Sequence, residues 1–585
     1  MCETIFEGNM SSRYPPEYKV ENNCLYMEQC TKQGKQTKKL CNFTPYVISE
    51  ITQDDGVSET KKLLLGGEHE NGRQLKEIEV DGNDLATFNW LMNAWGVDCI
   101  LEIGSNIKDY IRYAIQSTAK FATKQTTYAI TGWKKIEGKW KYLMPGLADT
   151  NVSLSGKLDR YEFIEEYTEK DIAKAFHLIS YDVAPKEIIY TLMAFTFMSP
   201  LNEFLHRANC EPKFVLFLLG KTGTRKSTLS ALFLSFFGKF TSSDLPLSFR
   251  DTANSITHHA FTLKDVLTCI DDFHPCGKQE ETKLTSTAQS IMRSYGDRTG
   301  RGRLKSDATP MDSRPPQGNA IITAEFPPDI GESGTARYFG LGLKSGDVNL
   351  SMLSMLQKEA SEGILQKTMY AYTKMISNFA NADEKKFVGS LAESFRIYRN
   401  EFNKQNIQCH GRVPEIVANL RIGMKMFLLF MKEHKVIDDE SCSNIEYEFF
   451  EILCVLAKRQ SENIEQDKPT HKFIRKLYAL IDSGSAVIIN RNFEPNITPN
   501  NLIGYEDDDY YYLNKTAAHR AVKKLCDEQG ESFTITEKGL LKALAEEKLI
   551  DTAEGQNTKS VRIGGKTKRV VCLIKSKSDL IADTT

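Results

Sequence analysis

The alternation of apolar and polar positions predicts strands near the start of the chain and helices soon after them. Residues 18–27 (YKVENNCLYM) and 43–53 (FTPYVISEITQ) alternate with a period of about two, which is typical of half-buried strands. Residues 82–96 and 106–121 instead carry apolar side chains at helical spacing. Two β-rich runs flank residues 134–138 and predict a hairpin. The first part of the chain is therefore expected to be a mixed α/β domain.

Further along, the pattern changes to that of a parallel sheet followed by a long helical region. Between residues 214 and 345, apolar runs alternate with helical segments, as in proteins whose strands are joined by helices. Residues 350–460 are amphipathic at helical spacing, and the polar stretch 460–472 predicts a linker. The fold class is α/β, with four predicted domains: an N-terminal α/β domain (1–155), a parallel α/β core (156–350), a helical subdomain (351–465) and a C-terminal domain (470–585).

A glycine-containing loop between an apolar run and a helix predicts a phosphate-binding site. The stretch 215–238, VLFLLGKTGTRKSTLSALFLSFFG, follows the pattern G-x-x-x-x-G-K-[ST] except at one position. Such a loop directs backbone N–H groups at phosphates, while its lysine binds the terminal phosphates and its hydroxyl binds Mg²⁺. We expect Lys226 and Ser227 to fill the last two roles. The predicted nucleotide-binding residues are Gly220, Gly223, Thr224, Arg225, Lys226, Ser227 and Thr228.

Arg225 stands where the pattern has its second glycine. If its backbone has ordinary angles, the side chain points away and its N–H still serves the phosphate. If φ is positive there, an arginine costs about 1 kcal/mol or more. The sequence leaves both alternatives open.

An apolar strand that ends in acids follows the loop, in the segment DVLTCIDDFHP. Asp271 is predicted to hold the Mg²⁺ shell together with Ser227, and Asp272 to orient the attacking water as catalytic base. Most ATPases of this kind have glutamate at the second position, and aspartate is one methylene shorter. The alternative without a catalytic role is a buried strand that leads into an acidic turn.

Two later segments predict the remaining catalytic residues. The strand in GNAIITAEFPPD offers Thr323 and Glu325 as the polar sensor of the γ-phosphate, and the sequence does not separate them. Arg337, in GESGTARYFGLGL, precedes another apolar strand, where ring-forming ATPases place an arginine that reaches the neighbouring subunit's site. The alternative is a surface arginine in a glycine-rich loop.

The segments GKTGTRKST, CIDDFHP, RTGRGRLKSDATP, NAIITAE and SGTARYF, in this order, resemble the AAA+ helicases of bacterial mobile elements and phages, in particular the MCM-like helicases of staphylococcal cassette elements. The resemblance covers about residues 130–585. It implies an AAA+ P-loop core, homo-hexameric rings that translocate on DNA, and a loop in which Arg225 is a family variant. It also implies a second sensor, Arg412, although a helix-start arginine at the surface is the alternative.

Basic residues near the end of the core and in the C-terminal domain are candidates for DNA contacts. The segment 292–307 (MRSYGDRTGRGRLKSD) is glycine-punctuated and basic, which suits phosphate contacts, with a solvated loop as the alternative. Helix, turn, helix and hairpin after residue 514 predict a winged helix, which binds DNA or another protein. The candidate DNA-binding residues are Arg301, Arg303, Lys305, Lys538, Lys542, Lys559, Arg562, Lys566, Lys568 and Arg569.

Composition and charge exclude few classes of function. The net charge of -2 excludes a globally basic nucleic-acid binder, so any DNA surface must be local. The chain begins without the pattern of a signal peptide and has no run of about 18 apolar residues, so we expect no membrane span and a cytoplasmic location. The resemblance implies that the source is bacterial. Trp90, Trp95, Trp133 and Trp140 are expected in the core, with stacking on bases as the alternative.

The sequence thus predicts an ATP-driven, Mg²⁺-dependent DNA helicase or replication-initiation motor of a mobile element. Its expected partners are single-stranded and origin duplex DNA, further copies of itself, and a primase or polymerase. The alternative is an ATP-switched DNA-binding regulator or clamp that does not unwind.

Overall fold

The computed structural model describes residues 10–582 apart from 32–33, 275–277, 301–312, 329, 467, 494–498, 530, 532, 534 and 554–555. The chain forms two compact units, which are described separately. The first unit contains residues 1–131 and 143–159, and the second contains residues 132–142 and 160–585. The four predicted domain ranges remain a prediction.

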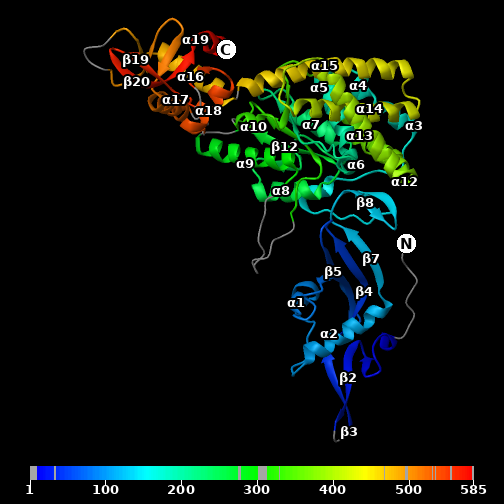
Figure 1. The fold of residues 1–585 in the computed structure, drawn as a ribbon. Coiled ribbons are helices and arrows are strands. Elements are labelled where there is room, and N and C mark those ends of the chain that lie inside the picture. Colours follow the sequence, from blue (N-terminus) through cyan, green and yellow to red (C-terminus); the bar gives the residue numbers. More distant parts are fainter. Residues whose placement is uncertain are drawn as a thin grey trace. The chain divides into compact units, whose positions relative to one another are not determined.

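The first unit is built on two sheets (Figure 1). One is antiparallel, with the order β1-β2-β3, and the other has the order β6-β5-β4-β7, with β7 parallel to β4. The strands are β1 (Tyr18–Glu21), β2 (Cys24–Thr31), β3 (Gly34–Cys41), β4 (Phe43–Asp54), β5 (Glu59–His69), β6 (Gln74–Asp81) and β7 (Thr123–Tyr128). The helices are α1 (Asn89–Trp95) and α2 (Ile107–Thr118). The predicted strand at 43–53 and the second predicted helix are confirmed. The run 18–27 forms two antiparallel strands with a turn at Asn22 and Asn23, and the first helix begins only at Asn89.

Three of the four tryptophans are buried in the core, as expected, and are not available for stacking on bases. Trp95, Trp133 and Trp140 are only 4%, 1% and 4% exposed. Trp90 packs edge-on against Trp95, with 5.2 Å between ring centroids. The three buried rings are core residues and present no face for a base.

The second unit contains a five-stranded parallel sheet with the order β11-β12-β13-β10-β14. Its strands are β10 (Val215–Leu219), β11 (Leu247–Ser248), β12 (Leu267–Phe273), β13 (Asn319–Ala324) and β14 (Tyr338–Gly342). Strands buried on both faces are expected to be apolar throughout, and the residues of β13 are all buried. The predicted strand at 215–219 is confirmed, and the sheet makes this part a parallel α/β structure.

Helices lie on both faces of this sheet. Side chains of α8 (Ala253–Thr262) and α9 (Lys278–Asp297) form one apolar cluster with Val215, Phe217 and Ile322. Helix α7 (Lys226–Leu234) packs against β12 and β13. The other helices of this region are α3 (Glu169–Ala175), α4 (His177–Ser180), α5 (Lys186–Met198), α6 (Asn202–Arg207), α10 (Gly331–Thr335), α11 (Leu350–Ser361), α12 (Ile364–Ala382), α13 (Glu384–Asn403), α14 (Val413–Glu433) and α15 (Asp439–Gln466).

The most apolar helix of the chain is α5, which packs against α14. The segment Lys186–Arg207 is long and apolar enough to cross a membrane by length and composition, with a mean hydropathy of 1.2 over the window tested. The sequence analysis had singled out no such segment. Of that window, 94% is buried inside the protein, as expected of a helix that is apolar all round and lies in a core.

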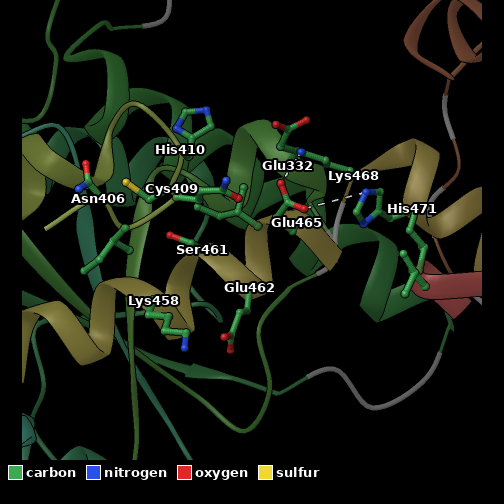
Figure 2. A pocket seen from close by; sticks show the side chains of 15 residues that line it. Glu332, Asn406, Cys409, His410, Lys458, Ser461, Glu462, Glu465, Lys468 and His471 are labelled. Carbon is green, nitrogen blue, oxygen red and sulfur yellow. Dashed lines mark hydrogen bonds and ion pairs between the residues drawn. The ribbon is translucent and has the colours of Figure 1, made fainter. Parts of the chain in front are cut away.

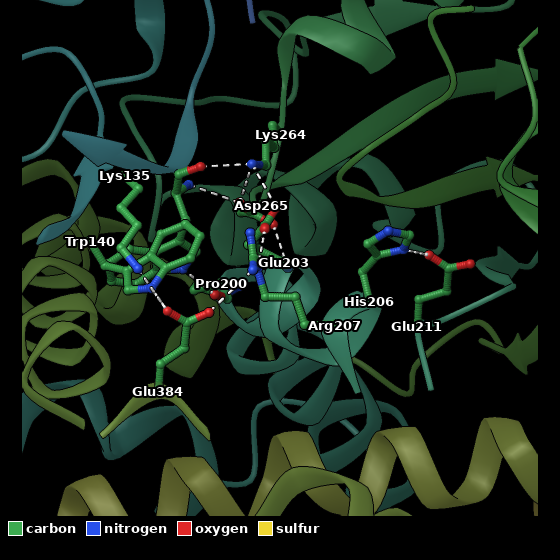
Figure 3. A network of polar contacts seen from close by, with 11 residues as sticks. Lys135, Trp140, Pro200, Glu203, His206, Arg207, Glu211, Lys264, Asp265 and Glu384 are labelled. Atoms are coloured by element: carbon green, nitrogen blue, oxygen red, sulfur yellow. Dashed lines mark hydrogen bonds and ion pairs between the residues drawn. The ribbon is translucent and has the colours of Figure 1, made fainter. Parts of the chain in front are cut away.

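A hairpin of β8 (Gly132–Ile136) and β9 (Lys139–Leu143) confirms the prediction at residues 134–138. A buried polar network joins it to the helices of the second unit (Figure 3). Asp265 accepts hydrogen bonds from the backbone N–H groups of Trp133 and Glu203, both at 2.9 Å. Burial raises the pKa of Asp265 to about 7. Glu384 accepts the indole N–H of Trp140 at 3.0 Å, so both strands of the hairpin are anchored.

The C-terminal part of the second unit carries the predicted helix pair and hairpin. The sheet order is β15-β16-β17-β20-β18, and β19 pairs with β20. The elements are α16 (Pro469–Asp482), β15 (Val487–Asn490), β16 (Leu502–Glu506), β17 (Tyr510–Leu513), α17 (Lys515–Gln529), α18 (Glu537–Glu546), β18 (Ile550–Asp551), β19 (Lys559–Ile563), β20 (Lys566–Ile574) and α19 (Lys575–Ala582). Thr536 caps α18 by accepting the N–H of Gly539. The predicted linker at 460–472 is wrong, since α15 continues to Gln466 and α16 begins at Pro469.

Candidate nucleotide-binding site

The loop after β10 has the tight course that its glycines predict. Gly220 donates its N–H to the carbonyl of Ala324, and a Cβ at Gly220 would lie 2.3 Å from the carbonyl oxygen of Leu343, so only glycine fits there. Gly223 has a φ of +87°, in the region that favours glycine. The buried hydroxyl of Thr224 donates to the carbonyl of Lys221 at 2.9 Å and closes the turn.

The loop leads into α7 in a way that suits an anion. Helix α7 begins at Lys226, and no side chain caps its first turn. The N–H groups of an uncapped first turn, together with the helix dipole, attract phosphate. The Lys226 ammonium donates to the carbonyls of Gly220 and Lys221, at 2.5 and 3.1 Å. Partial burial lowers the pKa of Lys226. The lysine therefore folds over its own loop, at the place where it would meet the terminal phosphates.

The start of α7 and two adjacent strands, β12 and β13, bring a hydroxyl, a carboxylate and a second hydroxyl together beside this loop. Ser227 Oγ donates to Asp271 Oδ1 at 2.8 Å, and Thr323 Oγ1 donates to the same oxygen at 2.5 Å. Thr323 Oγ1 also accepts the backbone N–H of Asp272 at 3.1 Å. The arrangement follows from the strand order, because β13 lies between β10 and β12 and its carboxyl end carries Thr323.

Asp272 and Glu325 both line one cavity of about 270 Å³, which Lys226, Ser227 and Thr323 also line. Asp272 lies in a register shift of β12 with a φ of +66°, and its Oδ2 is 3.3 Å from the guanidinium of Arg250.

The carboxylate of Glu325 contacts the phosphate-binding loop and the histidine that follows β12. It accepts a hydrogen bond from the hydroxyl of Thr222, which lowers the pKa of Glu325, and its Oε2 is 3.2 Å from His274 Nδ1. The two sensor candidates thus differ in their partners, since Thr323 contacts Asp271 and Asp272, whereas Glu325 contacts Thr222 and His274.

The residues of this cavity fit a nucleotide with Mg²⁺. The hydroxyl of Ser227 and the carboxylate of Asp271 are oxygen ligands of the kind that Mg²⁺ takes, usually with one or two carboxylates and substrate phosphates completing its shell. Among the residues that the structure describes, no group of three or more His, Cys, Asp or Glu side chains able to hold a metal occurs. Thr228, on the first turn of α7, also lines the cavity.

Arg225 has a φ of +69°, so the costly alternative of the two that the sequence left open is the one found. We expect Arg225→Gly to raise the free energy of unfolding by about 0.5–1 kcal/mol, because left-handed backbone costs arginine about 1–2 kcal/mol and glycine gives part of this back as unfolded-state entropy. ATP hydrolysis should stay within about twofold, because the backbone N–H is kept. Thermal unfolding and phosphate release measure the two effects.

The control for Arg225→Gly is Gly223→Ala in the same loop, which forces a side chain onto a φ of +87° and should lower stability. Loss of hydrolysis in Arg225→Gly would show that the guanidinium itself acts at the site.

Arg337 and Arg412 lie together, away from this cavity. Arg337 donates to Asp297 Oδ2 and Arg412 donates to Asp297 Oδ1, each at 3.0 Å. Since Val215 pairs with Tyr338 in parallel strands, Arg337 precedes the amino end of β14, whereas the loop follows the carboxyl end of β10. Five residues of strand separate these edges by about 16 Å. Arg337 therefore lies at the edge of the sheet opposite to its own chain's nucleotide loop.

The structure describes only some of the candidate DNA-binding residues. Arg301, Arg303 and Lys305 lie outside the described residues. Lys538 and Lys542 are on α18, Lys559 and Arg562 on β19, and Lys566, Lys568 and Arg569 on β20.

Several of the C-terminal basic side chains bind groups within the chain. Lys559 pairs with Asp551 at 2.6 Å, and Lys568 donates to the hydroxyl of Tyr505 at 2.5 Å. Arg569 donates to Gln556 at 2.6 Å. Lys538, Lys542, Arg562, Lys566 and Arg569 are exposed, whereas Lys559 and Lys568 are half-buried.

Three residues near the predicted groups had not been singled out. Arg250 reaches Asp272 from just after β11, a strand of two residues that gives no pattern. His274 follows the acid strand directly and contacts Glu325. Asp297 lies inside the predicted basic segment 292–307, directly before Arg298, and the sequence analysis named it in no role.

A larger cavity, of about 890 Å³, lies elsewhere in the second unit (Figure 2). It contains none of the predicted site residues, and its charged side chains are of both signs. Glu465 pairs with Lys468 at 2.5 Å, and His471 is 4.0 Å away from the same carboxylate. Burial lowers the pKa of His410, whose Nδ1 accepts the N–H of Arg412. Size alone does not mark a nucleotide site, and the smaller cavity carries the phosphate-binding chemistry.

Comparison with known proteins supports the fold. A family model described as "Domain of unknown function (DUF927)" matches residues 18–303. No curated protein matches the chain. Among solved structures, the chain is similar to "SCCmec type IV Cch - active helicase", with a TM-score of 0.60 and 13% identity, over 99% of this chain and 100% of that one. A second structure, "The A form apo structure of NrS-1 C terminal region-CTR(305-718)", has a TM-score of 0.24 and 10% identity, over 89% and 96%. The chain therefore has the fold of the first of these proteins along its whole length.

Proposed function

We propose that the protein is an ATP-driven, Mg²⁺-dependent DNA helicase with an AAA+ core, working as a homo-hexameric ring in replication of a mobile element. The observation that carries this proposal is the cluster of Lys226, Ser227, Asp271 and Thr323 beside an uncapped helix N-terminus. The shared fold with a protein described as an active helicase supports the choice among ATP-driven functions.

The chain's own residues divide the work at the nucleotide. The loop and the first turn of α7 bind the phosphates, Lys226 binds the terminal ones, and Ser227 with Asp271 holds the metal. Mg²⁺ bound with ATP neutralises charge on the β- and γ-phosphates. Asp272 orients the attacking water, and Thr323 fixes Asp272 through its backbone N–H.

The second half of the site comes from a neighbouring copy. Arg337 lies at the opposite edge of the sheet from its own loop, so it serves the nucleotide of the next subunit as an arginine finger, with Arg412 beside it. The α17–α18 pair with the β19–β20 hairpin acts as a winged helix that binds origin duplex, and the basic segment at 301–305 contacts DNA in the ring channel. A primase or polymerase completes the set of partners.

The test is strand displacement on a forked DNA duplex. The protein should separate the strands with ATP and Mg²⁺, and should fail to do so with ADP or in the presence of a chelator. The second candidate, an ATP-switched clamp, is favoured by Asp272, which is shorter than glutamate and is paired with Arg250. ATP hydrolysis together with DNA binding but without strand separation, at every fork polarity, would establish the clamp and exclude the helicase.

A further inference from the structure

The end of α9 binds both Arg337 and Arg412, and we call its residues Gly296 and Asp297 the cradle. Asp297 is the last residue of α9, and its carboxylate binds Arg337 through both oxygens and Arg412 through Oδ1, at distances of 3.0–3.2 Å. The side chain of Arg337 is only 14% exposed and that of Arg412 is 28% exposed. Arg337 also donates to the carbonyl and the hydroxyl of Ser333. Asp297 is the one acid that both guanidiniums share.

The position of Asp297 is unfavourable for helix stability alone. A carboxylate at the C-terminal end of a helix is repelled by the helix dipole. Partial burial would raise the pKa of Asp297, but the hydrogen bonds from Arg412 and Arg337 outweigh burial and lower the pKa. The acid is ionised here because the two guanidiniums compensate for its surroundings.

Gly296 completes the cradle beside Asp297. A Cβ on Gly296 would lie 2.5–3.0 Å from three side-chain carbons of Arg337, so the glycine leaves the space in which Arg337 runs. The carbonyl of Gly296 accepts a hydrogen bond from Arg412 at 2.7 Å.

The next residue, Arg298, fixes the backbone of this turn. Its guanidinium donates to the carbonyls of Pro212, Pro316 and Gly318, at 2.8, 3.1 and 2.7 Å. It also donates to the Asn319 side chain at 3.1 Å. Four acceptors from two separate segments hold it, so the cradle is anchored to the chain before β10 and to the start of β13.

We propose that Asp297 is a positioning residue, which holds Arg337 and Arg412 as a single two-arginine unit for the nucleotide of the neighbouring copy. This inference rests on the proposed function, because it requires a site shared between copies. Two guanidiniums can bind separate oxygens of a terminal phosphate only if their spacing is fixed beforehand. Asp297 fixes this spacing by binding both guanidiniums, and Gly296 leaves the space that the Arg337 side chain occupies.

The test is a double-mutant cycle on ATP hydrolysis by the full chain with DNA. Removal of an arginine finger costs about 10³-fold or more in kcat, so Arg337→Ala sets the scale. We expect Asp297→Asn to lower kcat by about 30-fold or more, with KM for ATP changed by less than about threefold. The double variant should be no slower than Arg337→Ala alone, because residues that act as a unit are not additive.

A matched control and a steric variant keep the test independent of folding. Glu393→Gln removes a carboxylate that pairs with the exposed Arg396 on α13, and it should leave kcat unchanged. Gly296→Ala keeps every charge but displaces Arg337, and it should reproduce the loss seen in Asp297→Asn. If Asp297→Asn fails to fold, kcat of Gly296→Ala becomes the test, and a normal kcat in that variant would overturn the positioning role.

Mixed assemblies separate failure of this inference from failure of the proposed function. Asp297→Asn chains carry an intact loop, and Lys226→Ala chains carry an intact arginine pair, so an equimolar mixture should regain hydrolysis that neither has alone. An unchanged rate in Arg337→Ala would overturn the shared site, and with it the proposed function. Two results would overturn the positioning role alone. In the first, kcat falls in Arg337→Ala but stays normal in Asp297→Asn. In the second, the losses of kcat in the two single variants add fully in the double variant.

Discussion

Replacing Lys226 with alanine should lower ATP hydrolysis by about 10²–10³-fold and abolish strand separation, as loss of one preorganised donor to transition-state charge does elsewhere. The ammonium lies over the mouth of the loop, on the carbonyls of Gly220 and Lys221. The other basic residues that line the same cavity, within the part of the chain that the structure describes, are Arg225 and His274. Phosphate release with and without DNA measures the first effect, and displacement of a labelled strand from a fork measures the second.

The matched control is Lys239→Ala, an exposed lysine beyond the end of α7 that pairs with Glu162 at 3.2 Å. This variant should hydrolyse ATP at the normal rate. Hydrolysis by Lys226→Ala at the rate of Lys239→Ala would mean that the loop does not bind the reacting phosphates, and the nucleotide site would have to be sought elsewhere.

The second large effect is expected at Asp272. Asp272→Asn should lower kcat by about 10²–10⁴-fold, the range that a positioned base contributes, while ATP binding is retained. Glu325→Gln should lower kcat far less, because its carboxylate is already bound to Thr222 and His274. Single-turnover hydrolysis, with nucleotide affinity measured separately, distinguishes loss of the chemical step from loss of binding.

Asp272→Glu tests whether the shorter side chain is fitted to its surroundings. The register shift in β12 and the positive φ of Asp272 place its carboxylate against Arg250, so a glutamate should be slower rather than faster. An active Asp272→Asn with an inactive Glu325→Gln would assign the base to Glu325 instead.

Local pattern was sufficient to predict the strand, the loop and the helix start of the candidate site. An unbroken apolar run of five residues and the glycine spacing predicted β10 and its turn, and the structure contains both. Pattern could not separate Thr323 from Glu325, because both follow the same strand and differ only in what β12 and the loop present to them. That difference depends on strand order, which is a property of the whole sheet.

The sequence also could not predict contacts made by segments without a pattern of their own. Arg250 follows a strand of two residues, and Asp297 binds arginines 40 and 115 residues further along the chain. The predicted linker at 460–472 failed for a related reason. Most of its residues belong to α15 and α16, and three of the polar ones, Gln460, Ser461 and Thr470, are buried. Polar composition there was mistaken for irregular structure.

The parallel pairing of β10 with β14 has a consequence for assembly. The loop and Arg337 lie at opposite edges of one sheet. Under the proposed function, each chain then carries one half of each of two shared sites. Copies joined head to tail then contain one complete site per contact, so an open row always lacks one, and only closure into a ring supplies it. Hydrolysis per chain should therefore fall on dilution, even at saturating ATP, and ring closure itself becomes a step at which a loading factor or DNA end can control the motor.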